Sequence, residues 1–168
     1  LRRVTDRTGA VLLDATDGRT YSDDRTVRLA TLHLLGDREG YISAPAVSVY
    51  SSQMVGFDLI NGVYSTSGTG GTAVLTISAK AQKAALEALD GRKGVVGVYN
   101  YKTGEILCAV SSPTYDPDDV PDLENDSTGD YEGVYVNRFT QASYVPGSIF
   151  KVVTTAAALA EIDDIESQ

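Results

Sequence analysis

The sequence has very few of the residues that carry metal and redox chemistry. Its 168 residues include one histidine, one cysteine, one methionine and no tryptophan. His33 is the only histidine, which excludes a metal site with several histidine ligands, so we expect this side chain to pack structurally. Cys108 is the sole cysteine and cannot form an internal disulfide. Within the stretch Glu105–Val110 it is predicted to be a buried strand residue, with a catalytic thiol as the alternative.

Long hydrophobic runs and an excess of basic charge are also missing. No run approaches the length of a membrane span, and no signal-peptide pattern is present. The 14 basic and 23 acidic residues give a net charge of −9, which argues against nucleic acid or an anionic membrane surface as the main partner. The length and the hydrophobic content of 42% suit one or two small domains. The first residue is Leu1 rather than Met, so we expect a trimmed chain.

The most informative segment present is Tyr144-Val-Pro-Gly-Ser-Ile-Phe-Lys151. Ser148 and Lys151 follow a Pro-Gly turn and precede the apolar run Val152–Leu159, which predicts a helix whose apolar face is buried. Residues i and i+3 share a helix face, so the Lys151 amine can reach the Ser148 hydroxyl.

This spacing makes Ser148 and Lys151 a candidate catalytic pair. A lysine whose pKa is lowered by burial can take the proton of a serine and so activate it as a nucleophile. A helix N-terminus also favours the negative charge that develops during attack. The alternative is that Ser148 is an ordinary helix N-cap.

The first part of the sequence predicts an irregular, β-rich region. Val4–Leu13 indicates two short strands around Thr8-Gly9. Arg25–Leu35 has helical spacing and ends at Gly36, a favourable residue after a helix. Ala44–Ile60 predicts a further helix followed by a turn.

A glycine- and serine-rich stretch, Ser65–Thr72, predicts a flexible connection. A phosphate-binding loop is excluded, because no lysine follows the glycines and a strand comes where a P-loop needs a helix. We therefore place a domain boundary here, between a first region at residues 1–72 and a second domain at residues 73–168.

The second domain has a more regular pattern. Val74–Ile77 predicts a strand, and Ser78 is a suitable cap for a helix over Ala79–Leu89 that is closed by Gly91. One face of this helix is predicted to carry three alanines, Ala81, Ala85 and Ala88.

A hairpin is predicted next, from Val95–Tyr101 and Glu105–Val110. With the helices on either side it predicts an α+β or α/β architecture, in which helices pack against an antiparallel sheet.

Residues 115–135 form an acidic stretch that contains prolines. It contains the carboxylates Asp116, Asp118, Asp119, Asp122, Glu124, Asp126 and Asp130. Calcium binding is one interpretation, but the spacing lacks the Asp-x-Asp-x-Asp-Gly pattern that ends in glutamate. We predict a solvated loop.

Several of these motifs together resemble the penicillin-binding proteins. The segment Asn137-Arg138 followed by Tyr144–Lys151 is similar to their active-site region, whose usual form ends in Pro-Gly-Ser-Thr-Phe-Lys. The opening of the same transpeptidase domain is matched in order by Leu75-Thr-Ile77, Gln82, Lys102-Thr-Gly-Glu-Ile-Leu107 and Ser112-Pro-Thr-Tyr-Asp-Pro117.

The N-terminal part resembles the non-catalytic portion of the class B members. Its landmarks are Arg3-Val-Thr-Asp-Arg-Thr-Gly9 with Val11-Leu12, His33-Leu-Leu-Gly-Asp37 through Gly40, Phe57-Asp58 and Gly62. The resemblance implies a non-catalytic pedestal followed by the first part of a penicillin-recognising transpeptidase fold, which stops after the nucleophile helix.

Two motifs of the family do not follow Ser148. No Ser-x-Asn occurs in the sequence, which ends at Gln168. Lys102-Thr103-Gly104 precedes the serine and joins two predicted strands, so we assign it to a hairpin turn and reject it as the family's Lys-Thr-Gly motif. The isolated chain is therefore expected to be inactive.

The resemblance implies a parent enzyme, a D,D-transpeptidase that cross-links peptidoglycan through a serine acyl-enzyme. Ser148 would be the nucleophile and Lys151 the general base; no metal or cofactor is expected. The expected partners are peptidoglycan stem peptides, β-lactam antibiotics and other proteins of cell-wall synthesis or division.

The same resemblance implies an extracytoplasmic location, with the membrane reached only through an anchor absent from this chain. Two alternative functions stay open. One is a β-lactam hydrolase or sensor that shares the Ser-x-x-Lys core, and the other is a non-catalytic interaction module.

Overall fold

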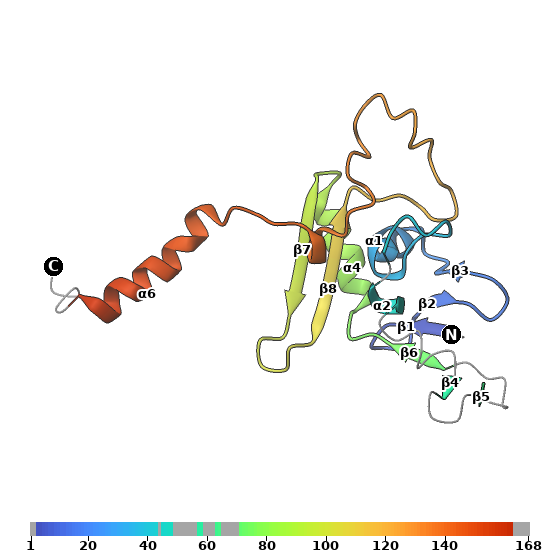
Figure 1. Ribbon diagram of the computed structural model, residues 1–168, viewed down its shortest axis with the longest axis horizontal. Helices are drawn as coiled ribbons and strands as arrows, with labels where there is room; N and C mark the ends of the chain where they lie inside the picture. The colour runs from blue at the N-terminus through green and yellow to red at the C-terminus, as the bar shows by residue number, and fades with distance from the viewer. Residues whose placement is uncertain (1–2, 44, 49–56, 59–62, 65–70, 163–168) are drawn as a thin grey trace.

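The computed structural model describes residues 3–43, 45–48, 57–58, 63–64 and 71–162. Three small sheets and several helices make a mixed α+β body, and one helix projects from it (Figure 1). The strands are β1 (Arg3–Thr5), β2 (Val11–Asp14), β3 (Thr20–Tyr21), β4 (Phe57–Asp58), β5 (Val63–Tyr64), β6 (Thr72–Val74), β7 (Gly94–Tyr99) and β8 (Ile106–Ser112). The helices are α1 (Arg25–Leu35), α2 (Pro45–Ser48), α4 (Ala79–Leu89), α5 (Arg138–Gln141) and α6 (Lys151–Glu161), with a 3₁₀ turn, η1, at Gly147–Phe150.

The two predicted N-terminal strands are confirmed, and they form the centre of a four-stranded sheet in the order β3-β2-β1-β6. The carboxylate of Asp6 closes the β1–β2 turn, because it accepts hydrogen bonds from the backbone N–H groups of Thr8 and Ala10 at 2.8 and 3.0 Å. Its other oxygen accepts the N–H of Ala79 at the start of α4, at 2.9 Å. One side chain thus ties the N-terminal sheet to the helix that follows it.

The strand predicted at Val74–Ile77 is shifted along the chain, and it pairs with β1. It lies at Thr72–Val74 and runs parallel to β1, so it belongs to the N-terminal sheet and not to the β7–β8 hairpin. The chain continues alongside β1 beyond the strand, with the N–H of Leu75 on the carbonyl of Thr5 at 2.9 Å. Local sequence could not show this pairing, because its partner lies at the other end of the N-terminal region.

Helix α1 is confirmed over its predicted range. The Asp24 carboxylate caps it by accepting the N–H groups of Thr26 and Val27, and Gly36 ends it at φ +78°. His33 is buried as expected, and its Nε2 lies 2.7 Å from the carbonyl oxygen of Val134. Burial lowers the pKa of His33, which favours the neutral ring that can donate one hydrogen bond here.

Helix α4 is also confirmed, with Ser78 as its N-cap, and the residues of its predicted alanine face differ in burial. Ala85 is buried and Ala88 is exposed, whereas the polar Gln82 is 0% exposed. The Gln82 amide nitrogen donates to the carbonyls of Ala30 and Ala109, at 2.8 and 3.1 Å, and its oxygen accepts the Ala109 N–H at 2.6 Å. Hydropathy alone places a glutamine outside, and only the partners on α1 and β8 make its burial favourable.

The predicted hairpin is confirmed as antiparallel β7 and β8, joined through a turn that contains Lys102, Thr103 and Gly104. The Asn100 side-chain oxygen accepts the N–H groups of Lys102 and Thr103 in this turn. Cys108 is a buried residue of β8, as expected.

The prediction of a helix followed by a turn over Ala44–Ile60 is confirmed in part where the structure describes this range. Pro45–Ser48 is helical, but Phe57–Asp58 is a strand that pairs with β5. Residues 44, 49–56 and 59–60 lie outside the described residues. The same holds for residues 65–70 of the predicted flexible connection, whose final residue, Thr72, begins β6.

The acidic stretch is an irregular segment, but one of its carboxylates is not solvated. Asp116 is 2% exposed and forms a bidentate pair with Arg28 of α1, with N–O distances of 2.8 and 2.7 Å. The hydrogen bond from Arg28 is the main cause that lowers the pKa of Asp116 below its usual value. The stretch is therefore held against α1 at this point.

Helix α5 lies against both strands of the β7–β8 hairpin, and a glycine makes room for it. A Cβ atom added at Gly97 of β7 would lie only 2.5 Å from Cε2 of Phe139, the second residue of α5. At Gly94 in the same strand, an added Cβ would lie 3.7 Å from the nearest atom, Cδ2 of Leu89.

We predict that Asp116→Asn lowers the free energy of unfolding at pH 7 by about 2–4 kcal/mol, because it leaves the Arg28 guanidinium without its buried counter-charge. Since the folded-state pKa of Asp116 is depressed, its contribution is fully present above about pH 4 and is lost as pH falls through the folded pKa. Urea unfolding at pH 7 and at pH 3 should show a weaker pH dependence in the variant. Asp130→Asn, on an exposed carboxylate of the same stretch, is the control. An unchanged acid dependence in Asp116→Asn would contradict the assignment.

We also predict that Gly97→Ala lowers the free energy of unfolding by about 1–3 kcal/mol, because the new methyl group must displace the Phe139 ring. Gly94→Ala makes the same change in the same strand and should be neutral or slightly stabilising. Chemical unfolding of the two variants side by side measures the difference. Equal stabilities would show that Phe139 moves aside without cost.

Candidate functional site

The structure places Ser148 within the 3₁₀ turn η1 and Lys151 at the first position of α6. Gly147 begins the turn at φ +55°, a left-handed conformation that favours glycine. The N–H of Lys151 donates to the carbonyl of Ser148, so the backbone between them is already helical. The helix predicted after Pro146-Gly147 is thus confirmed, and the two candidate residues lie one turn apart on it.

Ser148 is not an ordinary N-cap. The capping positions are Pro146 for η1 and Phe150 for α6, and neither makes a side-chain capping hydrogen bond. The interpretation of Ser148 as a helix cap is therefore wrong, and its hydroxyl is not used for helix capping.

The expected burial of the helix is also wrong. Every residue from Ser143 to Ala157 is exposed, with values of 93% at Val145 and 74% at Val152. Figure 1 shows α6 extending away from the sheets and from the other helices. The apolar run is helical as predicted, but burial needs a packing partner, and the described residues supply none for α6 beyond η1.

The Ser148 and Lys151 side chains are both exposed, and no hydrogen bond joins them in the described structure. The buried environment expected for Lys151 is therefore not present in this arrangement. The geometry brings the two residues onto one short helical segment without forming the nucleophile–base contact.

The segment that leads to Ser148 is attached to the body through Asn137. This side chain is 2% exposed, and its amide nitrogen donates to the carbonyl of His33 on α1 at 2.9 Å. Its side-chain oxygen accepts the N–H of Phe139 and caps α5. In the sequence Asn137 stands out only as part of the family resemblance, although an asparagine directly before a short helix is itself a capping pattern.

A second attachment lies beside Asn137. The N–H of Arg138 donates to the Ser111 hydroxyl of β8 at 2.9 Å. Helix α5 is therefore bonded to α1 on one side and to β8 on the other.

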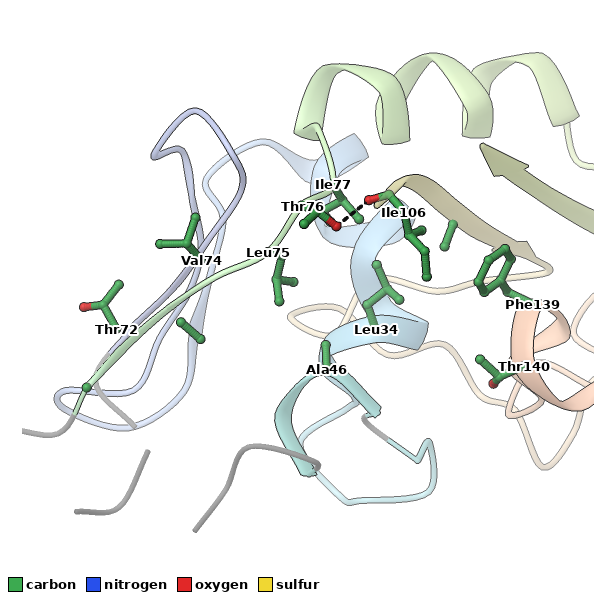
Figure 2. Close-up of a pocket in the computed structure, with 13 residues that line it drawn as sticks. Leu34, Ala46, Thr72, Val74, Leu75, Thr76, Ile77, Ile106, Phe139 and Thr140 are labelled. Carbon is green, nitrogen blue, oxygen red and sulfur yellow. Dashed lines mark hydrogen bonds between the residues drawn. The ribbon is translucent and has the colours of Figure 1, made fainter. Parts of the chain in front are cut away.

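An apolar cleft lies elsewhere, between the β6–Ile77 segment and the end of the body formed by β8 and α5 (Figure 2). It has a volume of about 590 Å³ and is lined mainly by aliphatic side chains and by Phe139. Thr76 at its wall is engaged, since its hydroxyl donates to the carbonyl of Ile106 at 2.7 Å. Neither Ser148 nor Lys151 lines this cleft.

A second, more polar cleft of about 670 Å³ is lined by residues that include Arg25, Lys93, Asp116 and Tyr131. Its two cationic side chains are paired: Arg25 lies 3.3 Å from Asp116, and Lys93 lies 2.7 Å from Glu132. Ser148 and Lys151 do not line this cleft either.

The described residues contain neither a metal-binding cluster nor a membrane-spanning helix. Among the described residues, no group of three or more His, Cys, Asp or Glu side chains is placed to hold a metal ion. None of the helices in the described part of the chain has the length and hydrophobicity needed to span a bilayer.

Comparison with known proteins identifies the segment that carries Ser148. Residues 94–162 match the family model of the penicillin binding protein transpeptidase domain. The chain is 38% identical over 103 residues to the peptidoglycan D,D-transpeptidase PbpA of Mycolicibacterium smegmatis, and 38% identical over 104 residues to that of Mycobacterium tuberculosis. Each match covers 54% of this chain and 21% of the relative, so the match spans about a fifth of the length of these relatives.

Two solved structures are similar in fold to most of this chain. The D,D-transpeptidase domain of a peptidoglycan glycosyltransferase from Eggerthella lenta is similar with a TM-score of 0.65 and 29% identity, over 94% of this chain and 36% of that one. PBP2 of Pseudomonas aeruginosa is similar with a TM-score of 0.62 and 26% identity, over 94% of this chain and 38% of that one. Residues 94–162 are therefore similar to the penicillin binding protein transpeptidase domain, and most of the chain has a fold similar to part of these two solved structures.

Proposed function

We propose that the complete protein containing this chain is a D,D-transpeptidase that cross-links peptidoglycan stem peptides, with Ser148 as nucleophile and Lys151 as general base. One observation carries the proposal. Ser148 and Lys151 lie one turn apart at the start of a helix, within the segment that matches the penicillin binding protein transpeptidase model. Relatives named as peptidoglycan D,D-transpeptidases support the choice of substrate.

In the acylation step, the Ser148 Oγ attacks the carbonyl carbon of the penultimate D-alanine while Lys151 Nζ takes the hydroxyl proton. The negative charge that develops on the carbonyl oxygen is stabilised in part by the backbone N–H of Ser148. The intermediate collapses, the peptide bond breaks, and the terminal D-alanine leaves after its nitrogen receives a proton.

The acyl-enzyme is then resolved by an amine of a neighbouring stem peptide. That amine attacks the ester carbonyl and loses a proton, a new amide bond forms, and Ser148 regains its hydroxyl. A β-lactam acylates the same serine, but its leaving nitrogen stays attached to the acyl group after the ring opens.

This chemistry requires the Ser148 hydroxyl and the Lys151 amine to be within hydrogen-bond distance and shielded from water, unlike their arrangement in this chain. The exposed Ser148 and Lys151 side chains form no hydrogen bond with each other in the described structure, and the sequence contains no Ser-x-Asn. We therefore expect the 168-residue chain alone not to react with penicillin at an appreciable rate.

We retain the division into a non-catalytic region at residues 1–72 and a transpeptidase region at residues 73–168 as part of the proposal. The first region would support the second and offer a surface to other proteins of cell-wall synthesis. Relatives of this family act on the cell wall, which favours an extracytoplasmic location for the complete protein.

The main test is penicillin labelling of the complete protein. We predict an adduct on Ser148 in the wild type, no adduct in Ser148→Ala, and labelling slowed by about 10²–10⁴-fold in Lys151→Arg, because arginine keeps the charge but cannot act as a base. Intact-mass spectrometry after incubation with benzylpenicillin measures all three. Circular dichroism should show that the variants remain folded.

Ser143→Ala is the matched control, since Ser143 is an exposed serine five residues before Ser148. It should be labelled like the wild type. Undiminished labelling of Ser148→Ala would overturn the site, rapid loss of the adduct would favour a hydrolase, and an unlabelled wild type would favour the non-catalytic interaction module.

A further inference from the structure

Helix α5 is the last element of the body before Ser148. Residues 142–147 connect it to the nucleophile position and include no strand or α-helix. A chain segment extends at most about 3.5 Å per residue, so the position of Ser148 is limited by where α5 is held. The contacts of α5 therefore matter for a reaction that takes place outside it.

Polar contacts fix the start of α5 from both sides. Asn137 donates to the His33 carbonyl of α1 at 2.9 Å, accepts the Phe139 N–H at 3.1 Å, and its own N–H donates to Oε1 of Gln141 at 2.8 Å. The Arg138 N–H bonds to Ser111 of β8. The Asn137 side chain thus joins α1 to the start of α5, and the Asn137 backbone N–H bonds the last residue of α5.

An apolar contact also holds α5 against strand β7. The Phe139 ring lies over Gly97 of β7, where no side chain larger than hydrogen fits without a shift. His33 adds a second bond between α1 and the preceding segment, through its Nε2 and the carbonyl of Val134 at 2.7 Å. These contacts leave α5 little freedom to move relative to α1 or to the hairpin.

We propose that Asn137 is a positioning residue for Ser148, acting through α5 and the connection at residues 142–147. This inference rests on the proposed function of Ser148. Misplacing a reacting group by about 1 Å can slow a reaction about 100-fold, so a shift of α5 should lower the rate of acylation more than the affinity for the β-lactam. A helix of the non-catalytic N-terminal region would in this way contribute to the chemistry.

Asn137→Asp isolates the contact with α1. An aspartate has the same shape and can still accept the Phe139 N–H, but it cannot donate to the His33 carbonyl. Asn100→Asp is the matched control. It makes the same change at an asparagine whose side-chain oxygen accepts two N–H groups in the hairpin turn, and both contacts survive the substitution.

The first measurement uses the 168-residue chain and does not depend on any activity. Amide hydrogen exchange of Phe139, Thr140 and Gln141 should be at least tenfold faster in Asn137→Asp than in the wild type, and within twofold of wild type in Asn100→Asp. Unchanged exchange in Asn137→Asp would overturn the claim that this residue holds α5.

The second measurement uses the complete protein and separates binding of benzylpenicillin from acylation by rapid-quench kinetics. In Asn137→Asp the acylation rate constant should fall at least tenfold, while the dissociation constant stays within twofold and thermal melting shows the protein folded at the assay temperature. An unchanged acylation rate, or a loss no greater than the unfolded fraction, would show a purely structural role and overturn the proposal.

A wild type that is not acylated at Ser148 would overturn the proposed function, and the exchange result would still decide whether Asn137 holds α5. Should Asn137→Asp fail to fold, Gly97→Ala displaces Phe139 without altering any polar contact, with Gly94→Ala as its control. The same selective loss of acylation is expected for Gly97→Ala, and its absence would count against positioning through α5.

Discussion

The burial of helix α1 is the constraint on which most of this structure depends. Its residues contribute to each of the three hydrophobic clusters: Val27, Leu34 and Leu35 to one, Ala30 to the second and Leu32 to the third. The first cluster joins the N-terminal sheet to Ile77 and Ala109, the second lies under α4 and β8, and the third reaches Tyr115 and Val134. A single helix from the N-terminal region therefore forms the common core of segments that are distant in the sequence.

Buried polar groups restrict how the segments of this core pack against α1. None of these contacts involves the proposed nucleophile, Ser148. Gln82, Asp116 and Asn137 are almost fully buried, and each is bonded to a group on α1. A buried polar group without its partner is costly, so these contacts allow few alternative packings. Beyond α5 no such contact exists in the described residues, and α6 carries a helical apolar pattern with no surface to bury it. The buried polar contacts thus link α1 to α5, and they end before residues 142–147, which lead to Ser148.

Several elements could be predicted from local sequence because their causes are local. Asp24 and Gly36 set the ends of α1, Ser78 sets the start of α4, and the Lys102–Gly104 turn closes the hairpin. The helical segment that carries Ser148 and Lys151 follows from Pro146-Gly147 and the apolar run behind it. The partners of these elements could not be predicted in the same way, as the placement of β6 beside β1 shows.

The sequence by itself determined the capped helices, the hairpin and the candidate pair, because each depends on residues within a few positions of one another. Only the tertiary structure decided that Gln82 is buried, that Asp116 is paired, that Asn137 joins α1 to α5, and that α6 stands exposed. For Gln82, Asp116 and Asn137 the deciding partner on α1 lies more than fifty residues away along the chain. Burial is a property of two surfaces in contact, and one stretch of sequence specifies only one of them.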